Sequence, residues 1–221
     1  MNFFQTILQY LQNLLYVLPA ILIGLTVHEY AHAFVAFKLG DPTARNLGRM
    51  TLNPLAHIDP IGFLMLIIVR FGWAKPVPIN PRNFKNYKRD DILVSLAGIT
   101  ANLIVAFLFS IVYMIGALKL GLGANVVFVN IVYLIVAINL TLAVFNLIPI
   151  PPLDGSHILD ILLGRRFPRF IILLHQYGMW ILIAFFVLSS FTGSGFGWLS
   201  NIVSGVANGF LKAAAWIVNL F

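Results

Sequence analysis

Long hydrophobic runs recur through most of this sequence, and several are long enough to cross a bilayer as helices. A crossing needs about 20 consecutive apolar residues. Only 10% of the 221 residues are charged and 60% are hydrophobic, whereas soluble domains carry about a quarter charged residues. No polar stretch is large enough to fold as a separate soluble domain. The sequence therefore predicts one polytopic membrane domain over residues 1–221 and excludes a water-soluble globular enzyme.

The periodicity and the proline and glycine positions predict an all-α fold with about five to six transmembrane helices. The expected crossings are Leu18–Leu39, Ile92–Leu118, Val126–Ile148, Phe170–Ser189 and Leu199–Leu220. Residues 1–17 are apolar but carry Gln5, Gln9, Gln12 and Asn13, which predicts a separate interfacial or entry helix. Residues 61–71 are too short to cross alone, which favours a re-entrant or interfacial segment. Glycines at 193, 195 and 197 are expected to separate the last two spans.

The positive charges indicate the orientation in the membrane. Eight of the fourteen Lys and Arg residues lie between Leu39 and Asp91, and three more lie at 165, 166 and 169. Basic connections tend to be cytoplasmic, so we expect the first and third connections there. This clustering is a topology signal, so the net charge of +7 does not indicate a nucleic-acid partner.

The predicted span Leu18–Leu39 contains the sequence His28-Glu29-Tyr30-Ala31-His32. Two histidines four residues apart project from one helix face and can chelate a metal, and the glutamate after the first can take a proton from a water at the open position. A chance pattern of hydrogen-bonded helix contacts is the alternative. Glu29 is the only glutamate in the chain, and an intramembrane ionisable group is by default a functional candidate.

A catalytic zinc needs a third protein ligand. With no cysteine and no second glutamate, and with Lys38 six residues beyond His32, that ligand must come from a remote segment. The candidates are His57, His157, His175, Asp41, Asp59, Asp90, Asp91, Asp154 and Asp160. We favour Asp154, because prolines unwind the chain before it and Gly155 allows close approach of backbone. It could equally be the cap of a short helix over residues 156–163.

The two motifs, His28 to His32 and Asn146-Leu147-Ile148-Pro149-Ile150-Pro151-Pro152-Leu153-Asp154-Gly155, together resemble those of the site-2 proteases, a family of zinc intramembrane metalloproteases. Between them, the stretch from Ser95 to Asn102 is similar to the small-residue motif of the family's middle core helix, which often has proline where this chain has Ile99. The resemblance covers residues 20–163 and is greatest to small bacterial members without accessory domains.

The resemblance implies a three-helix catalytic core at residues 20–163, with C-terminal helices at 170–220. It implies one Zn²⁺ per chain, held by His28, His32 and Asp154, with Glu29 as the base. Asn146 would steady the developing oxyanion, although a plain helix contact remains open for it, and Asn102 is a weaker substrate or oxyanion candidate. The implied activity is hydrolysis of peptide bonds in or near transmembrane segments of other membrane proteins, for signalling by regulated proteolysis or for clearing signal-peptide remnants.

The implied location is the lipid bilayer of a bacterial plasma membrane, with the active site towards the cytoplasm. A helical substrate must be unwound before its carbonyls can react, and an extended segment beside the metal would pair with it. Residues 49–53 and 75–80 are the candidates for a sheet-like element, with plain loops as the alternative. His57 is a loop histidine or a gating ligand, His157 is a neighbour of the site, and His175 is structural.

Two rival functions are weighed against proteolysis. A transporter would use intramembrane His and Glu as a relay, but such groups here cluster at one depth and no inverted halves are apparent. A catalytically silent relative would bind transmembrane segments without cutting them. The intact His, Glu and Asp set argues against the silent relative, because loss of Glu29 would be its expected mark.

Overall fold

The computed structural model describes residues 3–69, 72–192 and 197–221. These residues form helices and connecting loops, and no strand is assigned among them, so the predicted all-α class is confirmed. The α-helices are α1 (Phe3–Lys38), α2 (Thr43–Asn46), α3 (Pro60–Val69), α4 (Tyr87–Leu118), α5 (Val126–Asn146), α6 (Gly155–Leu163), α7 (Pro168–Thr192) and α8 (Gly197–Val218). Short 3-10 turns are η1 (Pro54–Ala56), η2 (Pro81–Asn83) and η3 (Leu122–Ala124).

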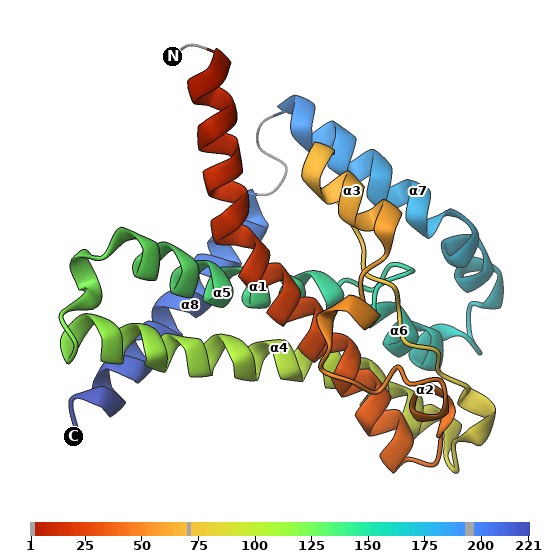
Figure 1. The fold of residues 1–221 in the computed structure, drawn as a ribbon. Coiled ribbons are helices and arrows are strands. Elements are labelled where there is room, and N and C mark those ends of the chain that lie inside the picture. Colours follow the sequence, from red (N-terminus) through yellow and green to blue (C-terminus); the bar gives the residue numbers. More distant parts are fainter. Residues whose placement is uncertain (1–2, 70–71, 193–196) are drawn as a thin grey trace.

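The N-terminal region differs from the prediction. Instead of an interfacial helix followed by a span, α1 is one helix of 36 residues with Pro19 inside it, and its direction changes along its length in Figure 1. Proline removes one helical hydrogen bond without ending a helix that neighbours support. Here the hydroxyl of Tyr10 donates to the carbonyl of Ile67 in α3. The first turns of α1 are thus attached to the bundle rather than separate from it.

The two long central helices begin at asparagine caps. The side chain of Asn86 accepts from the backbone N–H of Arg89 at the start of α4, and that of Asn125 accepts from Phe128 at the start of α5. These bonds satisfy amides that have no partner within the helix. The first cap explains why α4 begins five residues before the predicted Ile92, because the polar residues 87–91 form its first turns.

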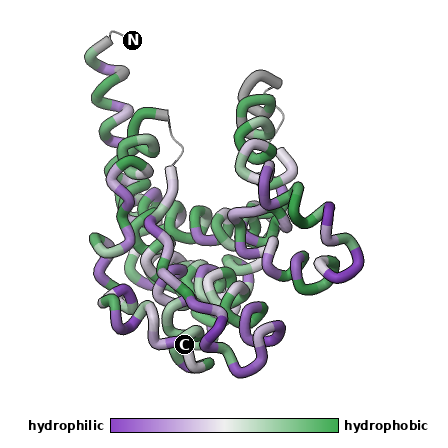
Figure 2. The backbone as a smooth tube through the Cα atoms, turned by 90° about the vertical axis from the view of Figure 1, so that its right-hand side faces the viewer, coloured by the Kyte–Doolittle hydropathy of each residue, from purple (hydrophilic) through white to green (hydrophobic). Residues whose placement is uncertain are grey.

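Helices α1, α4 and α5 contact one another pairwise, and α8 packs across α4 and α5. The interface between α4, α5 and α8 is apolar and includes two alanines. Its buried residues include Ala106, Val136, Leu140, Val203 and Ala207. Small residues permit close approach of helices in a membrane. In Figure 2 the hydrophobic residues occupy most of the helical length and hydrophilic residues gather in connecting segments. Five helices among the described residues are long and apolar enough to cross a membrane: α1, α4, α5, α7 and α8.

The connection between α1 and α4 folds back over the end of α1. It contains the ten-residue α3, which is too short to cross, as predicted. The expected sheet-like element is absent from the described residues, which contain a single antiparallel bridge between Ile58 and Ala74. Pro76 and Pro78 lack N–H groups for a ladder. The segment 75–80 is held instead by hydrogen bonds between its backbone and the side chains of Glu29, Arg49 and Asp41. The side chain of Val77 also packs on Ala33 of α1.

Candidate functional site

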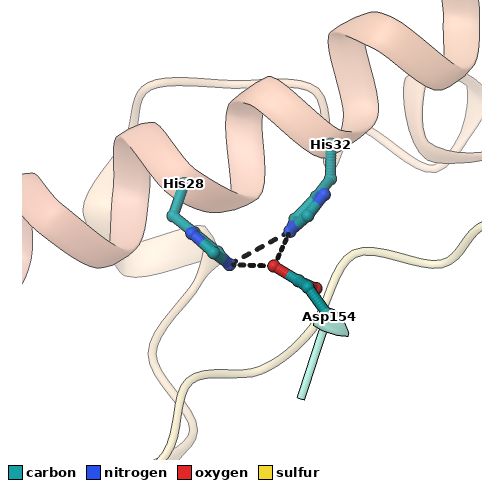
Figure 3. Close-up of side chains that lie close together, drawn as sticks. All are labelled: His28, His32 and Asp154. Atoms are coloured by element: carbon teal, nitrogen blue, oxygen red, sulfur yellow. Dashed lines mark hydrogen bonds and ion pairs between the residues drawn. The ribbon is translucent and has the colours of Figure 1, made fainter. Parts of the chain in front are cut away.

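The side chains of His28, His32 and Asp154 meet at one point, although 122 residues separate the second from the third. Figure 3 shows both imidazoles projecting from the same face of α1 towards the carboxylate that precedes α6. The two Nε2 atoms lie 3.0 Å apart, and each lies 3.3 Å from Oδ2 of Asp154. In the described part of the chain, these three residues are the group arranged to hold a metal ion.

Hydrogen bonds behind the imidazoles determine which ring nitrogens carry protons. Nδ1 of His32 lies 2.7 Å from the carbonyl oxygen of Val94, which can only accept, so this nitrogen donates. Nδ1 of His28 lies 2.7 Å from the side-chain oxygen of Asn102 and donates in the same way. In the neutral rings, both Nε2 atoms therefore present lone pairs towards Asp154.

The three facing atoms fit a zinc ion. A tetrahedral zinc with ligands at about 2.0–2.2 Å separates its ligand atoms by about 3.3–3.6 Å, which is close to the observed 3.0–3.3 Å. Oδ2 of Asp154 is buried and has no hydrogen-bond partner. Three electron-pair donors that converge without a hydrogen between them need a cation. Nitrogen and carboxylate oxygen are donors that zinc accepts.

The alternative role of Asp154 as a helix cap does not match its geometry. Asp154 occupies the N-cap position of α6, but its side chain makes no capping hydrogen bond. The residue after it allows the chain to turn tightly, because a Cβ built at Gly155 would lie 2.4 Å from the carbonyl oxygen of Leu147. Only glycine fits so close to backbone without displacement. This turn directs Asp154 back towards α1.

Glu29 lies beside the histidine pair and is held by backbone. Its side chain is buried, and Oε2 accepts a 2.8 Å hydrogen bond from the N–H of Val77. That N–H belongs to the 75–80 segment, which was predicted to lie beside the metal. One carboxylate oxygen is therefore anchored, and the other is available to a water molecule in the cavity beside it.

Two adjoining cavities meet at this site. A cavity of about 360 Å³ is lined by the three facing residues, Glu29, Asn146 and the 76–81 segment, and also by Asp91 and His157. A larger one of about 690 Å³ shares His28, Glu29 and Asn146, and continues between apolar residues of α3, α5, α7 and α8. The polar cluster thus opens into an apolar space on the side of the membrane-spanning helices.

The two asparagines assigned by resemblance occupy different places. Asn146 ends α5 and lines both cavities, and its amide nitrogen donates to the carbonyl of Leu142. An amide carries two N–H groups, so one remains for a ligand. Asn102 is fully buried on the far side of His28, where it contacts the imidazole rather than the cavity.

The remaining histidines have other partners. Nε2 of His57 donates to the carbonyl of Thr51, which makes it a loop histidine bonded to backbone. His157 pairs with Asp91 at 3.2 Å on the cavity wall, and His175 pairs with Asp160 on the outside. The carboxylate of Asp91 raises the pKa of His157 more than burial lowers it. Asp41, Asp59 and Asp90 accept hydrogen bonds from backbone amides away from the cluster.

Two further residues support the site without having been assigned a role from the sequence. A Cβ built at Gly98 of α4 would lie 2.5 Å from Nε2 of His32 and from Cε1 of His28, so only glycine lets the rings sit there. Asn139 of α5 is fully buried and accepts a hydrogen bond from Asn102. The sequence contains a feature that could have indicated this residue. Asn139 is a polar residue in an apolar span, and it lies seven residues, about two helical turns, before Asn146.

Comparison with known proteins gives two kinds of match. The profile of Peptidase family M50 matches residues 114–189, which include Asn146 and Asp154. The chain is 39% identical to "Putative zinc metalloprotease YwhC" of Bacillus subtilis over 78% of this chain and 80% of that protein. No solved structure matches the chain.

Proteins named Rip2, with the same description, are 31% identical. In Mycolicibacterium smegmatis the match covers 81% of this chain and 70% of the relative. In Mycobacterium tuberculosis it covers 88% and 76%. Relatives at this identity, matched over most of their length, establish the family. The chain therefore belongs to Peptidase family M50, the site-2 protease family, and is a zinc metalloprotease.

Proposed function

We propose that this protein is an intramembrane endopeptidase that hydrolyses peptide bonds in or near transmembrane segments of other membrane proteins. The observation that carries the proposal is the convergence of His28, His32 and Asp154 beside Glu29, which the N–H of Val77 holds in place. The cavity at this site continues into an apolar space among membrane-spanning helices. A soluble peptide would have no need of an apolar approach. A transmembrane segment would find in it an environment like the bilayer.

His28, His32 and Asp154 would hold one Zn²⁺ per chain, which supplies Lewis acidity to polarise water and the scissile carbonyl. Glu29 removes a proton from the attacking water as its oxygen bonds to the carbonyl carbon. When the C–N bond breaks, Glu29 returns that proton to the amine nitrogen. The carboxylic acid and amine that are released then ionise in water to a carboxylate and an ammonium group. The hydrogen bond from Val77 keeps the carboxylate of Glu29 directed towards the cavity.

Asn146 is positioned to donate its remaining N–H to the oxyanion that develops on the substrate carbonyl, because it lines both cavities. The segment 75–80 would accept the unwound substrate. Amide groups two residues apart in extended backbone face the same edge. An extended substrate-bound segment would therefore direct the N–H and carbonyl of Ile79 to the side where the N–H of Val77 contacts Glu29. Ile79 also lines the cavity.

The site faces the cytoplasm of a bacterial cell in this proposal. The connection that covers the end of α1 carries six of the fourteen basic residues, and Lys88 and Arg89 follow in the first turn of α4. Basic connections are retained inside. His32 lies six residues from the end of α1, on the same side as that connection. Substrates would be cut close to the inner surface of the plasma membrane, whether for signalling or for removal of signal-peptide remnants.

The decisive experiment compares Glu29→Gln with wild type on a membrane-protein reporter reconstituted in the same liposomes. Cleavage is expected to fall at least about 100-fold, because a positioned base contributes about 10²–10⁴ in rate. Zinc content, measured by atomic absorption, should stay near one per chain because Glu29 is not among the three converging residues.

The matched control is Asp160→Asn, which also replaces a carboxylate by an amide but lies at the His175 pair outside the cluster. It should cleave as wild type does. Each enzyme is also offered the reporter's soluble portion without its transmembrane segment. Cleavage by Glu29→Gln at the wild-type rate would refute the assigned mechanism, and equal cleavage of the soluble portion would refute the intramembrane substrate class.

A further inference from the structure

A chain of buried amides runs from α5 through α4 to the first histidine. The amide nitrogen of Asn139 donates to the carbonyl of Ile135 in its own helix at 2.8 Å. Its oxygen accepts from the amide nitrogen of Asn102 at 2.8 Å, and the oxygen of Asn102 faces Nδ1 of His28 at 2.7 Å. Asn139 and Asn102 are both 0% exposed. Three helices are thus connected by side-chain hydrogen bonds that end at an imidazole of the site.

The direction of this chain is determined by the two backbone carbonyls that it contacts, those of Ile135 and Gly24. A backbone carbonyl can only accept, so the group of Asn139 that faces Ile135 is the NH₂ and the group that faces Asn102 is the oxygen. Asn102 must then present its NH₂ to Asn139 and to the carbonyl of Gly24, which it reaches at 3.0 Å. Both N–H groups of Asn102 are used, and its oxygen is left for His28.

The consequence is a defined protonation of His28. Because the oxygen of Asn102 accepts from Nδ1, the neutral ring carries its hydrogen on Nδ1 and a lone pair on Nε2. A rotated Asn102 amide would present N–H groups to Nδ1 and favour a hydrogen on Nε2, which would then face Asp154 and His32. Partners that orient a metal-binding histidine in this way typically alter metal affinity by about 10- to 100-fold when removed.

We propose that Asn139 is a positioning residue of the zinc site, acting through Asn102 to hold His28 in the tautomer that presents Nε2 to the metal. The inference rests on the proposed ligand role of His28. The close approach of α5 to α1 supports it, because a Cβ on Gly24 would lie within 3.4 Å of the oxygen of Asn139. Glycine at this position leaves room for the amide chain between the helices.

The experiment measures the zinc dissociation constant of the full-length protein by competition with a chelator. Asn139→Ala should weaken zinc binding by about 10-fold or more. Ser110→Ala is the matched control, since Ser110 is equally buried in α4 and bonds only to Ala106 of its own helix. It should bind zinc as wild type does. The absorption spectrum of the Co²⁺-loaded protein gives a second readout, because it reports the ligand geometry and should change in the Asn139 variant alone.

A double-mutant cycle separates positioning from general stability. If Asn139 acts through Asn102, then Asn139→Ala changes zinc affinity by less than about twofold when Asn102→Ala is already present. An undiminished additional loss in that background would overturn the proposal, as would an Asn139→Ala single variant with wild-type affinity. Asn139→Leu keeps most of the side-chain volume and replaces the alanine variant if the latter does not fold.

A direct measurement on the wild-type protein needs no variant. In the metal-free protein, at a pH where the His28 ring is neutral, its ¹⁵N chemical shifts should report a hydrogen on Nδ1. A neutral ring with its hydrogen on Nε2 would overturn the proposal. The outcomes are distinct from failure of the proposed function. Failure of the proposed function would appear as cleavage by Glu29→Gln or as a wild-type protein that binds no zinc. If only the role of Asn139 is wrong, Glu29→Gln is still inactive and the wild type still binds zinc.

Discussion

At the scale of single residues, the site depends on a glycine as much as on its polar side chains. Gly98 lies against both imidazoles, where an added Cβ would lie 2.5 Å from two of their ring atoms. Contacts this short force the rings or the helix to move, because buried side chains have little free space. Close helix packing and ring orientation are therefore determined by the same residue.

We expect Gly98→Ala to weaken zinc binding at least about 10-fold, because the added Cβ forces both imidazole rings to shift. Loss of a hydrogen bond to a metal-binding histidine already weakens metal affinity by about this factor. Chelator competition on the purified protein measures the effect. Gly205→Ala in α8 is the control, since nothing lies within 4 Å of a Cβ there. The control should be neutral or slightly stabilising because alanine favours helix. Wild-type zinc affinity in Gly98→Ala would contradict the observed ring placement.

A second residue-scale prediction concerns pH. Burial raises the pKa of Asp41, but hydrogen bonds from the Thr43 hydroxyl, the N–H of Asn80 and the amide of Asn83 outweigh it and hold the pKa below its ordinary value of 3.8. A carboxylate with a lowered folded-state pKa stabilises the fold above its unfolded value, and this stabilisation is lost as pH falls through the folded value.

We therefore expect the wild-type melting temperature in detergent to fall below about pH 4. Asp41→Asn should lose about 1–3 kcal/mol of stability at neutral pH and show a weaker fall in acid. Asp59→Asn is the control, because asparagine caps a helix nearly as well as aspartate at the start of α3. Identical acid profiles for wild type and Asp41→Asn would show that Asp41 does not contribute this stability.

At the scale of elements, the connection between α1 and α4 brings the non-helical segment 75–80 to Glu29, the proposed catalytic base. Arg49 donates to the carbonyls of Lys75 and Pro76, and the N–H of Val77 goes to Glu29. With prolines at 76 and 78, the next backbone N–H along the segment after that of Val77 belongs to Ile79, which also lines the cavity. This leaves fewer pairing groups than a regular strand edge would offer.

Replacing Ile79 by proline removes that donor. We expect the cleavage rate to fall about 5-fold or more with zinc content unchanged, because one buried hydrogen bond contributes about 1 kcal/mol or more. Ile79→Ala keeps the N–H while losing the side-chain packing on α1. If substrate pairing is the cause, the proline variant is impaired more than the alanine variant. Equal cleavage by the two would indicate that packing, not pairing, is the role of Ile79.

At the scale of the whole molecule, the arrangement of the spans relative to the membrane is testable with unusual clarity because the chain contains no cysteine. Single cysteines can be introduced without background labelling. Positions in the two basic connections should face the cytoplasm, and the turn between α4 and α5, which carries the lone Lys119, should face the opposite side.

We expect Lys85→Cys and Arg166→Cys to react with a membrane-impermeant maleimide in inverted vesicles and not in intact cells. Leu120→Cys, which is 65% exposed, should show the reverse pattern. The cysteine-free parent is the control. Labelling of residue 85 from outside the cell would invert the proposed orientation and place the zinc site on the external face.

The sequence by itself determined the class of the molecule and the histidine pair of the site, His28 and His32. Hydrophobic runs reveal spans, and two histidines one turn apart share a face in any α-helix, because both properties are local. By spacing, Asp154 was one of nine candidates for the third ligand. We favoured it because of the prolines before it and the glycine after it. The continuity of α1 through Pro19 was missed because the contact that supports its first turns, from Tyr10 to Ile67, joins residues far apart in sequence.

Only the tertiary structure decided how the site is held. The carbonyl of Val94, the amide of Asn102 and the N–H of Val77 reach the histidines and Glu29 from α4 and from a loop. Which backbone group faces which ring depends on how closely and at what angle the helices cross. Gly98 of α4 permits the close approach to His28 and His32 of α1. Such contacts join residues with no periodic relation along the chain, so the sequence alone does not encode them in a readable pattern.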